Sequence, residues 1–384
     1  MKTLWCVGAG EEAVLGIQRA KEMGVRVIAS DGNPDAPGFR YADVAVTVDT
    51  YKAQATANEA SRLAQLDRIH GAIAMCVDVP MTVAAVQHAL GVPEVPASPD
   101  VAEFGGNKML QYQKLRMADI PVPETYAVAT AERLAAWRRN RDNVQGRIYP
   151  DGPWQQWVVK PVDGRGARGV IRLLDGVETG WAFEKAKDES RWGGVIVQEW
   201  IEGPQVSTEA VLFKDNCSVS VAVLDRNYEY LERYQPYVIE NGATGPSVLS
   251  ATQVDALERL TVAAGRALGV RQGTIKGDLA WGPDGPVLIE LALRLSGGYM
   301  STEAIPMATG VDLVEAAIRL ALGESIDRRD LLPKMAPRAV AIRYRFPEGP
   351  VQNHTQRGAH LTVTAPTRAE VVRLASAFTE QTHA

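Results

Sequence analysis

The sequence predicts a protein that is α/β in its first hundred residues and α+β beyond them. Short apolar runs alternate with helical stretches up to about residue 95, close to the roughly 30-residue rhythm of βαβ units. From Trp157 to about Leu322 the apolar runs become longer and more hairpin-like. The length of 384 residues exceeds what one core usually fills, so two or three domains are expected.

The N-terminal region predicts a small doubly wound parallel sheet. Its strands are bounded by glycines and by the turn signal Asp31-Gly32-Asn33-Pro34. The expected strands and helices are, in order, strand Leu4–Val7, helix Glu11–Met23, strand Val25–Ser30, strand Ala72–Val77 and helix Met81–Leu90.

The rest of the chain is expected to be less regular. Residues 92–100 contain three prolines and predict a linker. A helix over Lys108–Met117 is stopped by Pro121 and Pro123, and the polar stretch Asn140–Gln155 predicts a surface insertion. The tail predicts strands Ala339–Tyr344 and His360–Val363 and a helix Arg368–Phe378.

Composition narrows the class of protein. Hydrophobic residues make up 46% and charged residues 23%, as in ordinary soluble domains. A net charge of -5 argues against a broad nucleic-acid surface. The three cysteines, Cys6, Cys76 and Cys217, form no CxxC pair, which favours a reducing cytoplasm. No signal peptide or membrane-spanning run is expected.

Gly8-Ala9-Gly10 follows the first strand and partly matches a dinucleotide fingerprint, with Asp31 at the end of the second strand. Glu12 and Ala13 stand where the third glycine would help the helix approach the sheet. We therefore favour a tight strand-to-helix turn over a dinucleotide site.

A stronger nucleotide signal begins at Lys160, which ends the apolar strand Trp157–Pro161. The loop after it carries Gly164, Arg165, Gly166, Ala167, Arg168 and Gly169. Such a loop exposes backbone N–H groups and positive charge, which suit a polyphosphate. It lacks the Gly-Lys-Ser/Thr ending of a Walker A loop, and a hairpin turn with surface arginines explains the same residues.

A second segment, Gln198-Glu199-Trp200-Ile201, ends another apolar strand. It could present backbone amides and an apolar wall to an adenine. A core strand that turns at Gly203-Pro204 is the alternative, and the segment alone favours that interpretation.

The third segment is a hairpin in which Lys276 and Asp278 share one strand face. Glu290 ends the return strand, so the two carboxylates could converge on one site. Paired carboxylates suit Mg²⁺, whose other ligands come from substrate phosphates. Lys276 and Arg294 would supply positive charge to a phosphoryl group in transfer. A surface hairpin with ion pairs remains the alternative.

Taken in order, Lys108, Lys160 with its loop, Gln198–Ile201, Asp278 and Glu290-x-x-x-Arg294 resemble the ATP-grasp superfamily. The resemblance is to its carboxylate–amine ligase type, which includes carbamoyl-phosphate synthase and biotin carboxylase-like enzymes. It implies a pre-ATP-grasp, Rossmann-like domain over residues 1–100 and a small lobe over 101–205. A large lobe over 206–335 and a small C-terminal element over 336–384 would follow.

The resemblance also implies roles. Lys108 and Lys160 would hold phosphates of ATP beneath the lid Gly164–Gly169, and Asp278 and Glu290 would bind Mg²⁺, with Mn²⁺ as an alternative ion. The adenine and ribose contacts would come from Gln198, Glu199, Trp200, Ile201 and Gln205. Lys276 and Arg294 would be the catalytic cations.

Two positions depart from the family pattern. Ala292 stands where members usually carry an asparagine, which leaves the number of metal ions open. Gln205 stands where a ribose-binding acid is often found, and its amide can still hydrogen-bond a hydroxyl.

The function implied is ligation of a small-molecule carboxylate to an amine through an acyl phosphate, with release of ADP and phosphate. Candidate substrate residues are Arg233, Tyr237, Ser296, Gly297 and Gly298, although a solvated loop also explains the first two. A biotin carboxylase-like enzyme, a purine-pathway enzyme and a non-catalytic nucleotide-binding protein remain alternatives. No nucleic-acid or membrane partner is expected, and a homodimer is left open.

Overall fold

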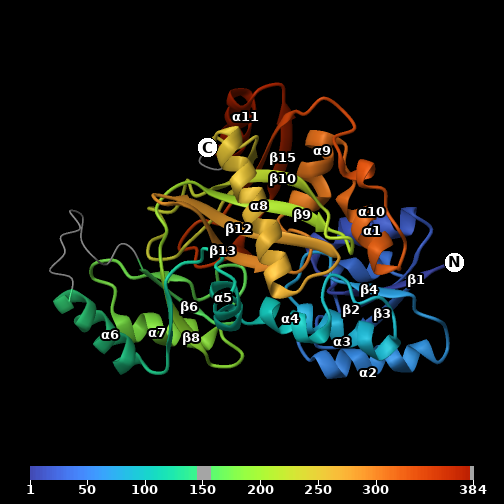
Figure 1. The fold of residues 1–384 in the computed structure, drawn as a ribbon, viewed down its shortest axis with the longest axis horizontal. Helices are drawn as coiled ribbons and strands as arrows, with labels where there is room; N and C mark the ends of the chain where they lie inside the picture. The colour runs from blue at the N-terminus through green and yellow to red at the C-terminus, as the bar shows by residue number, and fades with distance from the viewer. Residues whose placement is uncertain (145–156, 381–384) are drawn as a thin grey trace.

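The computed structural model describes residues 1–144 and 157–380. Three sheets organise this part of the chain, and Figure 1 shows them as three regions around a common centre. The N-terminal region lies at the lower right of that view, a small lobe at the lower left, and a large sheet above both. The mixed α/β class predicted from the sequence is confirmed.

The N-terminal sheet is parallel and has the strand order β3-β2-β1-β4. Its strands are β1 (Thr3–Val7), β2 (Arg26–Asp31), β3 (Val44–Thr47) and β4 (Gly71–Ile73). Helices α1 (Val14–Glu22), α2 (Ala53–Ala64) and α3 (Pro80–Leu90) accompany them. Helix α3 begins with Pro80 and ends before Gly91, which has a left-handed φ of 61°, so local sequence sets both of its ends.

Two short helices lead into the small lobe. They are α4 (Pro99–Gly106) and α5 (Lys108–Arg116). Asn107 begins α5, because its side chain accepts hydrogen bonds from the backbone N–H groups of Met109 and Leu110. Lys108, the first residue of α5, is thereby held at a defined point.

The small lobe is built on an antiparallel sheet in the order β5-β8-β6-β7. The strands are β5 (Thr125–Val128), β6 (Trp157–Pro161), β7 (Ile171–Arg172) and β8 (Val195–Glu199). Helices α6 (Ala131–Val144) and α7 (Thr179–Asp188) contribute Leu134 and Phe183 to one buried cluster with this sheet. Strand β6 ends at the loop that carries Gly164 and Arg165.

The large sheet has the order β13-β12-β9-β10-β11-β14-β15 and is antiparallel. Its first five strands in the chain are β9 (Gln205–Leu212), β10 (Ser218–Asn227), β11 (Gly242–Gly245), β12 (Gly273–Gly282) and β13 (Gly285–Ala292). Helix α8 (Ala251–Leu268) crosses this sheet in Figure 1 and buries Leu257 and Ala264 against Ile275. The capping box of Ser250 and Gln253 begins that helix.

Helices α9 (Ile305–Thr309) and α10 (Leu313–Ala321) connect the large sheet to the N-terminal region. Ile318 of α10 and Ile17 of α1 belong to the same buried cluster. At its edge, Arg19 forms ion pairs with Asp312 and Glu315, at 2.5 and 2.7 Å. One continuous core therefore joins the first and third regions of the chain.

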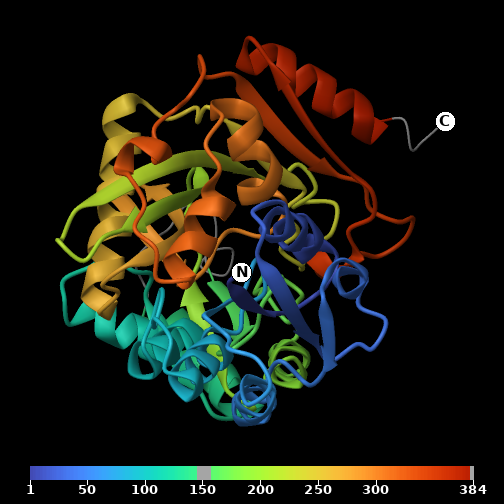
Figure 2. The same cartoon turned by 90° about the vertical axis from the view of Figure 1, so that its right-hand side faces the viewer.

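The C-terminal strands extend the large sheet. Strand β14 (Ala339–Tyr344) pairs with β11, and β15 (His360–Ala365) pairs with β14. Helix α11 (Arg368–Glu380), red in Figure 2, covers β14 through Val371 and Ala375. The strands expected as a small C-terminal element are thus continuous with the large lobe, because β11 offers them an open edge.

Several elements differ from the sequence-based expectations. Helix α4 begins at Pro99, inside the last two residues of the expected linker 92–100, since proline suits the first turn of a helix. The strand expected over Ala72–Val77 is observed as β4 and ends at Ile73. Residues 140–144 continue helix α6, and the remainder of the expected insertion, 145–155, lies outside the described residues. None of the described helices combines the length and the apolar character needed to cross a membrane.

Candidate functional site

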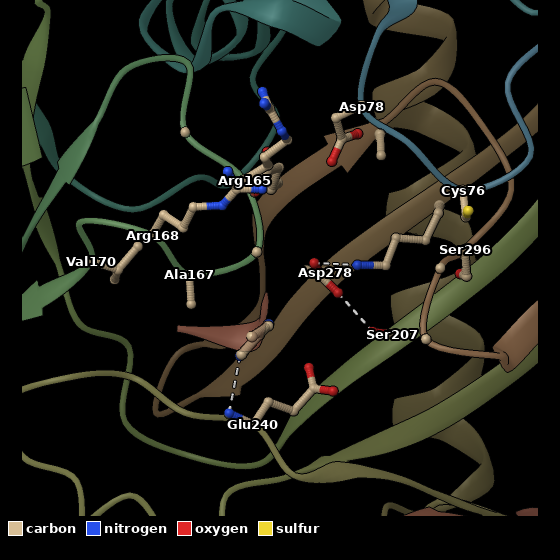
Figure 3. Close-up of a pocket in the computed structure, with 18 of the residues that line it drawn as sticks. Cys76, Asp78, Arg165, Ala167, Arg168, Val170, Ser207, Glu240, Asp278 and Ser296 are labelled. Carbon is tan, nitrogen blue, oxygen red and sulfur yellow. Dashed lines mark hydrogen bonds and ion pairs between the residues drawn. The ribbon is translucent and has the colours of Figure 1, made fainter. Parts of the chain in front are cut away.

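A cavity of about 740 Å³ lies where the three regions meet. This size is within the range of small-molecule sites. Figure 3 shows Arg165, Ala167 and Arg168 on one side of it, Asp278 at the centre, and Cys76 and Ser296 on the other side. Most residues that the sequence singled out line this cavity: Lys108, Lys160, Gly164, Arg165, Gly166, Ala167, Gln198, Glu199, Trp200, Ile201, Gln205, Lys276, Asp278, Glu290, Arg294, Ser296, Gly297 and Gly298.

The two predicted metal carboxylates are neighbours across a strand pair. Asp278 of β12 stands opposite Glu290 of β13, and the register shifts by one residue immediately after Asp278. Asp278 accepts a hydrogen bond from the Ser207 hydroxyl at 2.7 Å and also contacts Lys276 and Arg226. Burial opposes ionisation, but Arg226 and Lys276 hold the pKa of Asp278 well below its usual range.

Two lysines from different elements reach the same place. Lys108 Nζ lies 2.9 Å from Glu290 Oε1 and donates a hydrogen bond to the Gly164 carbonyl at 2.6 Å. Lys160 is buried at the end of β6, and its Nζ donates to the Tyr112 hydroxyl at 3.1 Å. Burial and the neighbouring charge of Lys108 lower the pKa of Lys160 to about 7.

The glycine-rich loop closes over these lysines and contacts both other regions. Arg165 stacks on the ring of Tyr51 from the N-terminal region, at 3.7 Å from its centroid, and Arg191 lies 3.2 Å from the same ring. The Gly166 carbonyl accepts a hydrogen bond from the backbone N–H of His354 at 2.9 Å. Gly166 and Ala167 have φ values of 58° and 57°, so the loop makes its turn in the left-handed region.

The loop carries positive charge that the protein does not fully satisfy. The Nε atoms of Arg165 and Arg168 are buried and have no hydrogen-bond partner among the described residues. Burial lowers the pKa of Arg165 to about 10. Burying a guanidinium N–H without a hydrogen-bond partner costs free energy. An anion bound in the cavity would supply the missing acceptors.

The strand end Gln198–Ile201 forms another wall of the cavity. The Gln198 side chain faces inward to the small lobe, where its Nε2 donates to the Thr125 hydroxyl at 2.9 Å. The carboxylate of Glu199 accepts the backbone N–H of Glu124 at 3.1 Å. The Gln205 side-chain oxygen accepts from the Tyr228 hydroxyl at 2.9 Å.

Arg294 lines the cavity, but it is already paired. Its Nε and NH2 lie 2.6 and 2.7 Å from the two carboxylate oxygens of Asp78, and NH1 donates to the Leu295 carbonyl at 2.7 Å. In this structure Arg294 is therefore engaged in an ion pair with Asp78, and its contact with an acyl phosphate stays a prediction. The pair instead ties the large sheet to the N-terminal region, because Asp78 follows β4.

Three predicted site residues lie off the cavity. Arg233 is exposed and lies beside the rings of Tyr230 and Tyr234, so the cavity wall does not include it. Tyr237 packs edge-on to Trp181 instead. Gly169 packs against helix α7, where a Cβ would lie 3.0 Å from the Ala186 Cα. Arg233 and Tyr237 belong to the loop 228–240, of which Tyr228, Val238 and Glu240 line the cavity instead.

Sequence reasoning missed a chain of ion pairs along the cavity. Arg226 joins Asp278 to Glu240, at 3.3 and 2.7 Å, and Arg357 binds the other oxygen of Glu240 at 3.1 Å. His354 accepts the Glu240 backbone N–H at 3.2 Å through Nε2. Burial and Arg357 lower the pKa of His354 well below its usual range, so the ring stays neutral.

Residues that follow the parallel strands of the N-terminal sheet also line the cavity. Glu12 and Asp78 line the cavity, and Asp78 could have been anticipated because it closely follows a parallel strand. Arg226, His354 and Arg357 gave no comparable signal, since they come from an ordinary strand and from the tail. Among the residues described, no three acid, histidine or cysteine side chains gather as a metal cage.

Comparison with known proteins decides the family. A profile of the ATP-grasp domain matches residues 105–298, just over half of the chain. The chain belongs to the ATP-grasp family. The matched segment contains Lys108, Lys160, Asp278, Glu290 and Arg294.

Individual relatives of this ATP-grasp chain are distant. The uncharacterized protein y4rH of Sinorhizobium fredii is 26% identical over 281 residues, which are 72% of this chain and 54% of that protein. The chain therefore spans about half the length of this relative.

Solved structures share the fold over almost the whole chain. The L-amino acid ligase from Bacillus licheniformis has a TM-score of 0.75 at 16% identity and covers 98% of this chain and 96% of its own. N5-carboxyaminoimidazole ribonucleotide synthetase, solved as an ADP complex, has a TM-score of 0.76 at 14% identity. The match covers 100% of this chain and 97% of the synthetase chain. At these identities the likeness is one of fold.

Proposed function

We propose that this ATP-grasp protein is an ADP-forming ligase that activates a carboxylate with ATP and joins it to an amine. The observation that carries the proposal is the central group of the cavity. Asp278 and Glu290 are cross-strand neighbours, Lys108 contacts Glu290, and Lys160 lies buried beside them beneath the arginine-bearing loop. This is a dense array of alternating charge suited to a polyphosphate and a divalent ion.

The residues fit Mg²⁺ in number and type. Magnesium is usually held by one or two carboxylates together with substrate phosphates, and Asp278 and Glu290 are two such groups on one cavity wall. Both carboxylates are at present neutralised by protein cations, which are the charges a metal ion would replace. Bound there, Mg²⁺ would neutralise phosphate charge and so favour phosphoryl transfer.

The protein's own groups account for the rest of the chemistry. Lys108, Lys160, Arg165 and Arg168 surround the space beneath the loop and would hold the phosphates, while the segment at Trp200 would contact the base. A substrate carboxylate oxygen would attack the γ-phosphorus, and the bond from that phosphorus to ADP would break. The loop contacts with Tyr51 and His354 would exclude water, which would otherwise hydrolyse the acyl phosphate.

The second half-reaction transfers the acyl group. An amine nitrogen would attack the acyl carbon, the bond to phosphate would break, and the amine would lose one proton. Lys276 and Arg226, both in contact with Asp278, lie where they can neutralise charge on the departing phosphate. Arg294 could join them only after leaving Asp78, so we assign it a positioning role in the resting state.

An ADP-release assay over a panel of carboxylates and amines, with ATP and Mg²⁺, tests the proposal. Glu290→Ala and Lys160→Ala should abolish ADP formation and leave the melting temperature close to that of the parent. Glu184→Ala, at an exposed position on α7, is the matched control and should keep full activity.

Other outcomes point elsewhere. Near-normal turnover in either site variant contradicts the assignment. Turnover that depends on bicarbonate and biotin indicates a carboxylase. Binding of ATP without stimulated turnover by any substrate indicates a non-catalytic nucleotide-binding protein.

A further inference from the structure

The end of the cavity opposite the arginine-bearing loop has no role in the chemistry described so far. It is walled by Glu12 from the N-terminal region, by Ser296–Gly298 after β13, and by Tyr344 and Arg357 from the tail. Figure 3 shows Ser296 beside Cys76, across Asp278 from Arg165 and Arg168. Glu12, Tyr344 and Arg357 all lie outside the segment 105–298 that the family profile matches.

Three polar groups at this end lack partners. The Tyr344 hydroxyl, the Arg357 Nε and the Ser296 hydroxyl are buried and have no hydrogen-bond partner among the described residues. Each such group destabilises the folded protein when it is left unsatisfied. Three of them on one cavity wall indicate a ligand that accepts hydrogen bonds.

The orientation of two of these donors is fixed by the fold. The Arg357 guanidinium stacks on the ring of Tyr344 at 4.1 Å from its centroid, and its NH2 donates to the Glu240 carbonyl and carboxylate, both at 3.1 Å. Burial raises the pKa of Tyr344, so the phenol keeps its proton and remains a donor.

Both donors lie next to one glycine. A Cβ on Gly298 would lie 2.9 Å from the Tyr344 hydroxyl and 3.7 Å from Arg357 NH1. Gly298 has a φ of 64°, a conformation that few other residues adopt readily. The absent side chain therefore leaves the phenol and the guanidinium close to the backbone of the loop.

A carboxylate approaches the same glycine from the N-terminal region. Glu12 Oε2 accepts the Gly298 N–H at 2.7 Å, and a Cβ on the preceding Gly297 would lie 2.6 Å from that oxygen. Glu12 is partly exposed, and no ion pair with a lysine or arginine is recorded for it in the described part of the chain. The Glu12 carboxylate, which can bind a cation, therefore lies beside the same glycine, Gly298, as the Tyr344 and Arg357 donors, which can bind an anion.

We propose that this end of the cavity binds the amine substrate, and that this substrate is an α-amino acid with a free carboxylate. The carboxylate accepts from Tyr344, Arg357 and Ser296, and the ammonium group faces Glu12. An α-amino acid carries both charges on one carbon, which matches donors and an acceptor gathered around one glycine. The proposal rests on the proposed ligase function and names its acceptor.

A phosphate ester fits less well. Its two negative charges would lie close to Glu12, and like charges within a few ångströms repel strongly in a buried site. The second acid of the same turn, Glu11, also lines the cavity. A zwitterion avoids this repulsion because its positive end meets the acidic wall.

Equilibrium binding tests the proposal without requiring turnover. The full chain, with and without ADP and Mg²⁺, is titrated calorimetrically with each of the twenty common L-amino acids, and with inorganic phosphate and ribose 5-phosphate. We expect one or a few amino acids to bind at micromolar to millimolar concentration. The best ligand is then compared with its C-terminal amide and its N-acetyl derivative.

Two variants separate the two charges. Tyr344→Phe should weaken the amino acid about tenfold, as expected for a hydrogen bond to a charged group, and should weaken the amide less, because its carbonyl is a neutral acceptor. Glu12→Gln should weaken the amino acid and the amide, and leave the N-acetyl derivative unchanged. Tyr230→Phe, which removes a hydroxyl away from the cavity, is the control and should change none of these affinities.

The opposite results overturn the proposal. They are equal weakening of acid and amide by Tyr344→Phe, tighter binding of phosphate or ribose 5-phosphate at this site, or no binding by any of the twenty amino acids. Failure of the ligase function gives a different pattern, since amino acids would still bind and respond to Tyr344→Phe while no ADP is released.

Discussion

Replacing Lys160 with methionine should remove a proton that the protein takes up when it binds ATP. Lys160 is buried among Lys108, Glu290 and Asp278, and its pKa falls from 10.5 to about 7. That difference corresponds to roughly 5 kcal/mol against the charged form. In the ligand-free protein near neutral pH, about half of the molecules therefore carry a neutral Lys160.

A bound triphosphate should restore the charge, because an anion next to the amine favours its protonated form. At pH 8 a group with a pKa of about 7 is protonated in roughly a tenth of molecules, so binding should take up about 0.9 proton. At pH 6 the uptake should fall to about 0.1 proton. The affinity for ATP should accordingly weaken as pH rises above about 7, by up to about tenfold per pH unit.

Calorimetric titration with ATP and Mg²⁺ in buffers of different ionisation enthalpy measures this uptake. Lys160→Met should lose most of the uptake at pH 8 and should flatten the pH dependence of affinity. Lys214→Met, at an exposed turn before β10, should behave as the parent protein does. An uptake at pH 8 that is the same in Lys160→Met and in the parent would refute the reasoning.

Two further predictions concern the walls of the cavity. Tyr51→Leu removes the ring on which Arg165 and Arg191 stack, so the glycine-rich loop should close less firmly over the cavity. We expect the KM for ATP to rise about 3- to 30-fold while the melting temperature stays unchanged. Equal KM values in the variant and the parent would contradict this role of Tyr51. Gly298→Ala places a methyl group 2.9 Å from the Tyr344 hydroxyl at a φ of 64° and should lower the free energy of unfolding by about 1–3 kcal/mol in urea titrations. Gly176→Ala, at a φ of 81° in open space, should cost less, and an equal cost would show that the close contact does not matter.

Many of the residues that line the cavity, and that we propose bind the nucleotide, could be predicted from short segments of sequence. Lys276 and Asp278 share a face because strand residues alternate. The short turn brings the two strands together, and a one-residue register shift after Asp278 places Glu290 opposite it. Lys160 and the glycines after it follow from an apolar strand that ends in a charged, flexible loop. These are local relations, so the order of residues is enough to reveal them.

Local reasoning does not reveal a side chain's partner when that partner is distant in the sequence. Arg294 has the expected position, but its carboxylate partner is Asp78, more than two hundred residues earlier in the chain. Arg233 and Tyr237 have suitable chemistry, but neither lines the cavity, although other residues of the same loop do. Orientation of a loop depends on what it packs against, and the sequence of the loop does not contain that information.

The order of Lys108, Lys160 with its loop, Gln198–Ile201, Asp278 and Glu290-x-x-x-Arg294 was sufficient to show a resemblance to the ATP-grasp family. The residues predicted to bind phosphate belong to that set and line one end of the cavity. The opposite end required the folded chain. Glu12, Gly298, Tyr344 and Arg357 come from the first helix region, the middle and the tail, and they meet only because β14 pairs with β11 and the core around α1 and α10 holds the N-terminal region in place. Contacts between residues so far apart depend on packing of whole elements, for which a single sequence carries no periodic signal.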